Sequence, residues 1–163
     1  MFDRVVSGGQ TGVDRAALDA ARELNVLCGG WCPEGRKAED GRLAACYPLH
    51  ETPTADYAQR TEWNVRDSNG TLVLTRGRPT EGTAFTIEVA QRLGKPCLVL
   101  DLSKKPQESS VWDWAKKYRI QTLNVAGPRE SKCPGVYEQA KTFLHKILGG
   151  QRAANSSPAG PSQ

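Results

Sequence analysis

A glycine-rich segment near the start of the chain, Ser7-Gly-Gly-Gln-Thr-Gly-Val-Asp-Arg15, constrains the fold more than any other feature. It follows a short apolar run, Val5-Val6, and an amphipathic helical pattern begins directly after it. Glycine permits a tight turn and the close approach of another molecule, and a helix N-terminus offers unpaired N–H groups. A strand, a glycine loop and a helix in this order predict a site for a phosphate or another compact anion. The alternative is a tight strand-to-helix turn without a ligand.

Length and composition are those of one globular domain. The chain has 163 residues, of which 25% are charged and 38% hydrophobic, and these are ordinary values. Its net charge of +4 is scattered, without the basic stripe that is typical of nucleic-acid binding. No membrane-spanning run and no signal-peptide pattern is found, so we expect a cytoplasmic protein that binds neither membrane nor nucleic acid. Five widely spaced cysteines are typical of reduced thiols, and no metal site is predicted.

Apolar, strand-like runs alternate with helical patterns through residues 1–150, which we expect to form a single domain. The expected strands are 70–75, 95–101 and 122–125, and the expected helices are 57–65, 83–93, 111–118 and 136–148. This alternation predicts an α/β fold with a mostly parallel sheet and helices on both faces. Residues 26–56 are irregular and dense in Gly, Pro and Cys, which favours a functional segment such as a lid over a ligand. Residues 151–163 have the composition of a disordered tail.

Three loops are expected to gather at one edge of the sheet, because ligands bind at the carboxyl ends of parallel strands. They are the first glycine loop (residues 7–12), the second glycine loop (residues 76–83) and the third loop (residues 126–131). Each contains glycine and offers hydroxyl or guanidinium groups, which bind phosphate well. Each arginine alone could equally have a surface role. From the irregular segment, Trp31 or Tyr47 could stack on a planar ring or simply anchor the segment.

Five stretches of the chain resemble one family. They are Ser7-Gly-Gly-Gln-Thr-Gly-Val-Asp-Arg-Ala-Ala-Leu18, Gly30-Trp-Cys-Pro-Glu-Gly-Arg-Lys-Ala-Glu-Asp40, Asn64-Val-Arg-Asp-Ser-Asn-Gly-Thr-Leu72, Gly82-Thr-Ala-Phe-Thr86 and Leu123-Asn-Val-Ala-Gly-Pro-Arg-Glu-Ser131. Over nearly all of residues 1–148 the chain is similar to the molybdenum-cofactor carriers, also classed as the circularly permuted YpsA branch of the SLOG superfamily. This resemblance implies a Rossmann-like fold, a homodimer or homotetramer, and a ligand site at the three loops. The implied cargo is the molybdenum cofactor (molybdopterin), a phosphorylated pterin dithiolene held until a molybdenum-dependent apoenzyme takes it.

The candidate binding residues follow from the loops and the resemblance together. They are Gly8, Gly9, Gln10, Thr11, Gly12, Asp14, Arg15, Arg36, Arg76, Gly77, Gly82, Thr83, Gly127, Arg129 and Ser131. Two positions depart from the pattern of the family. Glu81 stands where relatives typically have Gly, which brings a carboxylate to a predicted anion site, and Asn69 stands where relatives often have Asp.

Other function classes stay open at this point. A nucleotide-binding sensor or a nucleoside-monophosphate-processing hydrolase fits the superfamily, because a purine and a pterin are both planar and joined to phosphate; a free oxyanion is a further candidate ligand. The related hydrolases carry Glu three residues after the Thr of their Gly-Thr motif, where this chain has Thr86. Glu88 lies about 200° further round the helix. We therefore expect a carrier rather than an enzyme, with Asp14 or Asp40 as the carboxylates that could substitute. Cys32 and Cys46 are the cysteines expected nearest to a ligand.

Overall fold

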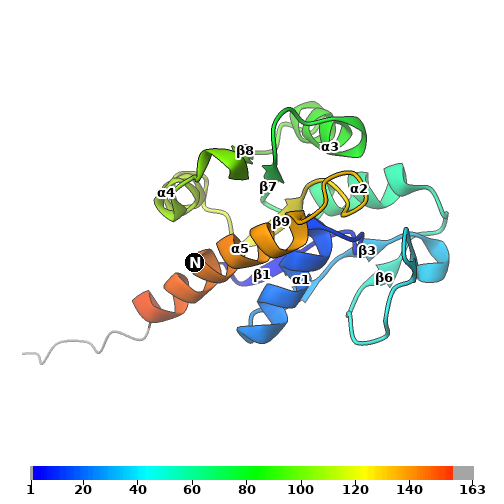
Figure 1. Ribbon diagram of the computed structural model, residues 1–163, viewed down its shortest axis with the longest axis horizontal. Helices are drawn as coiled ribbons and strands as arrows, with labels where there is room; N and C mark the ends of the chain where they lie inside the picture. Colours follow the sequence, from blue (N-terminus) through cyan, green and yellow to red (C-terminus); the bar gives the residue numbers. More distant parts are fainter. Residues whose placement is uncertain (1, 156–163) are drawn as a thin grey trace, which may run out of the picture.

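A five-stranded parallel sheet forms the centre of the molecule, and the computed structural model describes residues 2–155 of it (Figure 1). The strand order is β2-β1-β9-β7-β8, and every neighbouring pair is parallel. The strands are β1 (Arg4–Val6), β2 (Leu27–Gly29), β7 (Gly70–Thr75), β8 (Cys97–Asp101) and β9 (Thr122–Ala126). The expected parallel sheet is confirmed.

Helices cover both faces of this sheet. They are α1 (Val13–Glu23), α2 (Tyr57–Arg66), α3 (Glu81–Arg92), α4 (Glu108–Tyr118) and α5 (Val136–Asn155), with a 3-10 turn η2 (Leu102–Lys104) after β8. On one face, α1, α4 and α5 pack against Leu72, Leu74 and Val125 of the sheet in the largest core cluster. Figure 1 shows α1 and α5 side by side there. A smaller cluster, centred on Val65 and Val89, joins α2 and α3 on the other side. The predicted Rossmann-like α/β fold is confirmed.

The expected helices and strands are all present, with small shifts at their ends. Helix α3 begins at Glu81, two residues earlier than expected. Helix α5 continues through Gly149 and Gly150 to Asn155, five residues into the predicted tail. The remaining residues of that tail, 156–163, lie outside the described residues.

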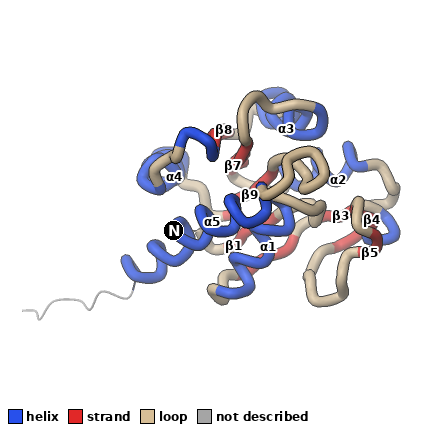
Figure 2. Tube along the Cα trace, in the orientation of Figure 1, coloured by secondary structure: helices blue, strands red, loops and turns tan. Residues whose placement is uncertain are grey.

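The segment 26–56 is less irregular than its composition suggested. Its first residues form β2, an edge strand of the main sheet. This strand was not predicted, because it is only three residues long and ends in glycine. The rest contains β3 (Trp31–Cys32) paired with β6 (His50–Glu51), a 3-10 turn η1 (Glu34–Arg36), and β4 (Lys37–Ala38) paired with β5 (Gly41–Arg42). Figure 2 shows these short strands joined by long loops at one end of the molecule. We call residues 30–51 the flap.

The flap is held down by one arginine and one apolar cluster. Arg36 donates hydrogen bonds of 2.8–3.1 Å to the main-chain carbonyls of Leu43, Ala44, Tyr47 and Leu49. Cys32, Leu43 and Leu49 pack together against Leu18 of α1. Because the guanidinium of Arg36 donates to carbonyls of the flap itself, Arg36 stabilises the fold of the flap.

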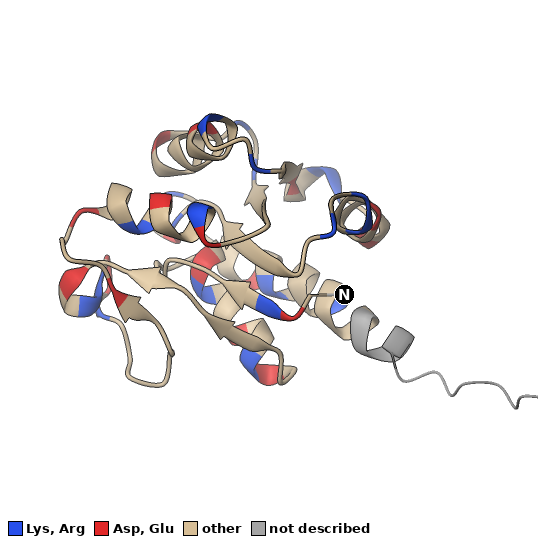
Figure 3. Ribbon diagram, turned by 180° about the vertical axis from the view of Figure 1, so that it is seen from behind, with Lys and Arg blue, Asp and Glu red and all other residues tan. Residues whose placement is uncertain are grey.

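No helix within residues 2–155 is long and apolar enough to cross a bilayer. Figure 3 shows basic and acidic residues interspersed along the helices rather than gathered by sign. All five cysteines are free thiols.

Candidate functional site

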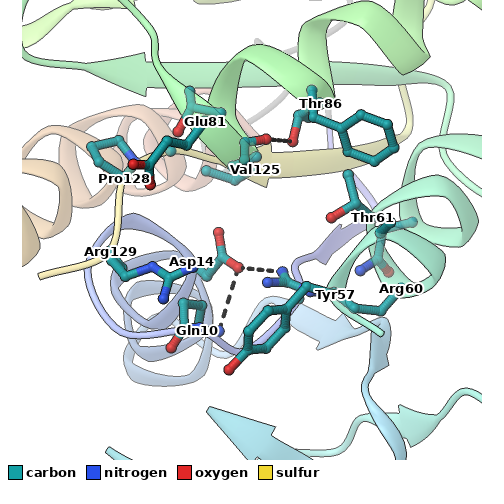
Figure 4. Close-up of a pocket in the computed structure, with 18 of the residues that line it drawn as sticks. Gln10, Asp14, Tyr57, Arg60, Thr61, Glu81, Thr86, Val125, Pro128 and Arg129 are labelled. Atoms are coloured by element: carbon teal, nitrogen blue, oxygen red, sulfur yellow. Dashed lines mark hydrogen bonds and ion pairs between the residues drawn. The ribbon is translucent and has the colours of Figure 1, made fainter. Parts of the chain in front are cut away.

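A cavity of about 320 Å³ opens at the carboxyl ends of the central strands (Figure 4). Four parts of the chain line it: the first glycine loop with the start of α1, one face of α2, the N-terminus of α3 and the third loop after β9. The lining residues are Gly8, Gln10, Asp14, Tyr57, Ala58, Arg60, Thr61, Asn64, Thr80, Glu81, Gly82, Thr83, Phe85, Thr86, Asn124, Val125, Ala126, Gly127, Pro128, Arg129 and Lys132. This is the edge of the sheet at which the three loops were expected to meet.

A buried ion pair forms the floor of the cavity. Arg60 Nη1 lies 2.9 Å from Asp14 Oδ2, and the same oxygen accepts from the Gln10 N–H at 3.3 Å. Burial raises the pKa of Asp14 above its ordinary value, although the guanidinium of Arg60 opposes that shift. A Cβ at Gly8 would stand 1.8 Å from Arg60 Nη1. Glycine at position 8 therefore leaves the space through which the side chain of Arg60 reaches Asp14.

Gln10 lies beside this pair with one half of its amide unused. Its Oε1 accepts from the N–H groups of Thr11 at 3.0 Å and Glu39 at 2.8 Å, which fixes the orientation of the amide. The residue is only 5% exposed, and Nε2 finds no hydrogen-bond partner within residues 2–155. A buried donor without a partner is costly, so a ligand acceptor at this place would be stabilising.

One wall of the cavity is aromatic and surrounded by cations. The ring of Tyr57 has three basic side chains around it, with Lys37 Nζ at 4.8 Å and the guanidinium carbons of Arg60 and Arg129 at 5.2 and 5.6 Å from its centroid. Phe85 of α3 lines the same cavity. This wall combines a surface for a planar ring with positive charge for an anion.

The mouth of the cavity lies at the N-terminus of α3. Gly82 has open space around the position of a Cβ, so a ligand can approach the backbone there. Glu81 has a φ of 48°, a left-handed conformation that glycine adopts without strain. Its carboxylate is exposed and lies 3.5 Å from Lys132 Nζ across the mouth.

The first glycine loop and the third loop are bound mainly to each other. The Val13 N–H donates to the Pro128 carbonyl at 3.2 Å, and the Glu130 N–H donates to Thr11 Oγ1 at 3.1 Å. A Cβ at Gly12 would stand 2.3 Å from the Pro128 oxygen, and Gly12 has a φ of 76°. Glycine here permits backbone to pack on backbone.

A carboxylate of the flap closes this contact. Glu39 accepts from the Ser131 N–H at 3.2 Å, from Ser131 Oγ at 2.5 Å and from the hydroxyl of Thr11. Arg129 Nη1 lies 4.0 Å away. Desolvation alone would raise the pKa of Glu39, but the hydrogen bonds from Ser131 and Thr11 lower it. Glu39 thus occupies donors that the sequence assigned to an external anion.

The predicted binding residues divide into two groups. Those that line the cavity are Gly8, Gln10, Asp14, Gly82, Thr83, Gly127 and Arg129. Those that do not line it are Gly9, Thr11, Gly12, Arg15, Arg36, Arg76, Gly77 and Ser131. Arg15 turns back to the Gly9 carbonyl and pairs with Asp40 at 3.0 Å, and Arg76 donates to Cys133 Sγ at 3.0 Å. These two guanidiniums bind the protein's own groups.

The other candidates from the flap also have internal partners. Trp31 packs edge-on against Trp63 at 4.8 Å between ring centroids, and Tyr47 donates to Asp19 Oδ1 at 2.6 Å, which favours the anchoring role for both. Cys32 is buried in the flap's apolar cluster and Cys46 is exposed; neither lines the cavity. Among residues 2–155, no group of three His, Cys, Asp or Glu side chains is arranged to hold a metal ion.

The sequence reasoning missed the contribution of α2. Tyr57, Arg60, Thr61 and Asn64 all line the cavity, and their spacing of three, four and seven residues places them on one face of a helix. Asn64 also bonds to both main-chain polar groups of Trp31 at 2.8 and 2.9 Å, which ties the flap to the cavity wall. A polar helix face next to a glycine loop was the available signal.

Comparison with known proteins agrees with this architecture. Residues 5–148 match the sequence profile of the circularly permutated YpsA SLOG family. The chain belongs to this family. The resemblance found in the sequence motifs is therefore confirmed.

A solved structure is similar over nearly the whole chain. It is the crystal structure of a "Putative molybdenum carrier protein" from Syntrophus aciditrophicus SB, with 43% sequence identity and a TM-score of 0.85. The similarity covers 90% of this chain and 94% of that one. Among curated proteins, none matches.

Proposed function

We propose that this SLOG-family protein binds a phosphorylated cofactor, above all the molybdenum cofactor, and shields it as a carrier or store. The observation that supports this most is the layout of the cavity, with a buried polar floor, an aromatic wall and a cationic mouth. A ring joined to a phosphate presents these chemistries in the same order. At about 320 Å³ the cavity lies at the lower end of small-molecule sites. It suits the pterin and phosphate of such a cargo.

The described lining residues favour binding over nucleoside-monophosphate hydrolysis. Thr86, at the position of the hydrolase carboxylate, donates its hydroxyl to the Gly82 carbonyl at 3.0 Å. Glu88 is exposed and does not line the cavity. The carboxylates that do are Asp14, which Arg60 engages, and Glu81, which faces Lys132. Neither stands three residues after Thr83, the position at which the related hydrolases carry their Glu.

A nucleotide-binding sensor is the second candidate. It shares the ring, wall and phosphate chemistry, and the aromatic wall at Tyr57 accepts a purine as well as a pterin. The name of the 43%-identical structure favours the molybdenum-cofactor cargo over a nucleotide.

The test is retention of the free cofactor. Purified protein is incubated with molybdenum cofactor and desalted, and retained pterin is oxidised and measured by fluorescence, with AMP as competitor. Retention that AMP does not displace supports the carrier. No retention, or ready displacement by AMP, moves the function to nucleotide binding, and release of ribose 5-phosphate from AMP would show hydrolysis.

We also propose that the protein assembles as a homodimer or homotetramer and hands its cargo to molybdenum-dependent apoenzymes in the cytoplasm. Large apolar side chains stand exposed at both edges of the sheet, Leu27 on β2 at 73% and Val99 on β8 at 40%. Open sheet edges with apolar residues are suited to self-association. Light scattering of the eluted protein tests the assembly, and a monomer would contradict it.

A further inference from the structure

We infer that Asp14 and Gln10 read the hydrogen-bonding edge of the bound ring, and that this ring is a 2-amino-4-oxopyrimidine, the unit shared by pterins and guanine. The inference rests on the proposed function, since it concerns the orientation and class of the ligand in the same cavity. It assigns the phosphate to the opposite end, at the N-terminus of α3.

The floor of the cavity is unsuited to a phosphate. Asp14 is a carboxylate only 4% exposed, and its charge is already matched by a single cation, Arg60. The N–H groups nearest to this carboxylate are already donated within the protein, Gln10 N–H to Asp14, Thr11 N–H to Gln10 and, at the start of α1, Val13 N–H to Pro128. A second anion at this place would meet a buried negative charge in a site of low dielectric.

The same floor is suited to a neutral ring edge that carries both donors and an acceptor. Asp14 Oδ2 holds Arg60 and the Gln10 N–H, while the other carboxylate oxygen points toward the open centre of the cavity (Figure 4). The Ser7 hydroxyl near this carboxylate is committed to the Val125 carbonyl at 2.7 Å. Gln10 Nε2 adds a buried donor without a partner. The floor thus combines an acceptor on Asp14 with a donor on Gln10, two residues that are linked through the Gln10 N–H.

A 2-amino-4-oxopyrimidine presents the matching row of an amino group, a ring N–H and a carbonyl. Asp14 would accept from the two N–H donors, and Gln10 Nε2 would donate to the carbonyl. Adenine has neither the ring N–H nor the carbonyl, and hypoxanthine lacks the amino group. A site built to satisfy buried polar groups rejects rings that leave them unpaired.

The phosphate then falls at the mouth. Lys132 lies at that end, 3.5 Å from Glu81 at the start of α3, and α3 presents the N-terminus of a 12-residue helix with open space at Gly82. Helix N-termini and cations bind phosphate together. The exposed Glu81 carboxylate, now paired with Lys132, has to yield that cation to the ligand.

The test compares ligands that differ by single groups. Dissociation constants are measured by calorimetry for GMP, IMP and AMP, and 6-hydroxymethylpterin is compared with 6-hydroxymethyllumazine, which carries an oxygen in place of the 2-amino group. We expect GMP to bind at least about tenfold more tightly than IMP, the value of one hydrogen bond to a charged group. AMP should bind most weakly, and the pterin should bind more tightly than the lumazine.

Two variants test whether Asp14 and Gln10 are responsible for the discrimination between these ligands. Asp14→Asn should bring the ratio of GMP to IMP affinity close to one. Gln10→Met should weaken GMP and IMP by the same factor and leave their ratio unchanged. Asp40→Asn is the matched control, since Asp40 also pairs with an arginine at 3.0 Å but lies outside the cavity. Circular dichroism checks folding, and if Asp14→Asn does not fold, the wild-type ratios and Gln10→Met decide.

Equal binding of GMP and IMP together with equal binding of pterin and lumazine would overturn the inference, as would absence of binding by all of these. So would a preference that survives in folded Asp14→Asn. The carrier proposal is judged separately by retention of molybdenum cofactor after desalting. Retention of the cofactor without discrimination between rings would contradict only the proposed recognition of the ring by Asp14 and Gln10. Discrimination between rings without retention would contradict only the carrier function.

Discussion

The first and second glycine loops have similar sequences of small and hydroxyl residues but opposite environments. In the first, a Cβ at Gly12 would collide with the Pro128 carbonyl, and the Thr11 hydroxyl is held by Glu39. In the second, Gly82 faces open space at the mouth of the cavity. One loop is filled by the protein's own backbone and carboxylate, and the other is open to a ligand.

This difference shows that a glycine motif has two physical uses that look alike in sequence. Glycine can admit a ligand to the backbone, or it can admit another segment of the same chain. At Gly8 and Gly12 the space is taken by Arg60 and Pro128, so these glycines mainly make room for other groups of the protein. The following predictions break or sharpen this contrast, beginning with the largest expected effect.

Alanine at the two glycines gives the most direct contrast. Gly12→Ala adds a Cβ 2.3 Å from a backbone oxygen at a φ of 76°, and we expect it to lower the free energy of unfolding by roughly 4 kcal/mol. Gly82→Ala, in open space within α3, should change it by less than about 1 kcal/mol. Urea unfolding measures both. Equal losses at the two positions would contradict the contrast.

Removal of the cation from the floor should have the next largest effect. Arg60→Met leaves the carboxylate of Asp14 buried without a cation, and we expect a loss of about 3 kcal/mol in the free energy of unfolding at neutral pH. Burial raises the pKa of Asp14 already in the wild type, and without Arg60 it rises further. The protonated acid carries no charge, so the loss should shrink as the pH falls toward 4 and grow as the pH rises.

Unfolding of Arg60→Met and wild type is therefore compared between pH 4 and pH 8. The control is Arg66→Met, whose partner Asp67 is 45% exposed and whose own side chain is 50% exposed, and it should cost less than about 1 kcal/mol. A loss in Arg60→Met that does not depend on pH would show that packing, not the charge of Asp14, is responsible.

Weakening the flap contact should have a smaller, local effect. Hydrogen bonds from Ser131 and Thr11 lower the pKa of Glu39, so this contact stabilises the fold above the ordinary pKa of a glutamate. Its contribution is lost as the pH falls through the lowered value. We expect Glu39→Gln to cost about 1 kcal/mol at neutral pH and to remove that part of the acid sensitivity.

Loss of the Glu39 contact should let the flap open more often, and tryptic cleavage after the exposed Arg42 measures how often it opens. The rate should rise in Glu39→Gln, and it should stay at the wild-type level in Glu34→Gln, an exposed carboxylate of the same flap. The same variant asks whether the Glu39 position is an anion site in its own right. Inorganic phosphate that slowed cleavage of Glu39→Gln would show that the first glycine loop can take an external anion after all.

The sequence predicted the layers of the fold well, because hydrophobic periodicity is a local signal. The run 70–75 became β7 with the expected bounds, and the strand, loop and helix at the start of the chain became β1 and α1. Which glycine loop stays open could not be predicted. That depends on Arg60 and Glu39, which reach the loops from 46 and 28 residues away, and no local pattern records such contacts.

The smallest effect is expected at the mouth, where the second glycine loop carries Glu81. Glu81→Gly removes the strain of a left-handed conformation at a residue with a side chain. It also removes the carboxylate that pairs with Lys132. A screened charge contact is worth up to about 1 kcal/mol, so a phosphorylated ligand such as GMP should bind roughly three- to fivefold more tightly.

Glu81→Gln, which removes the charge but keeps the side chain, should give most of this gain, and Glu88→Gln on the exposed side of α3 should give none. The unphosphorylated guanosine should not respond to either change, because it has no group for Lys132. If guanosine gained as much as GMP, or if GMP did not gain, the phosphate would not lie at α3, and the open loop would serve another part of the ligand.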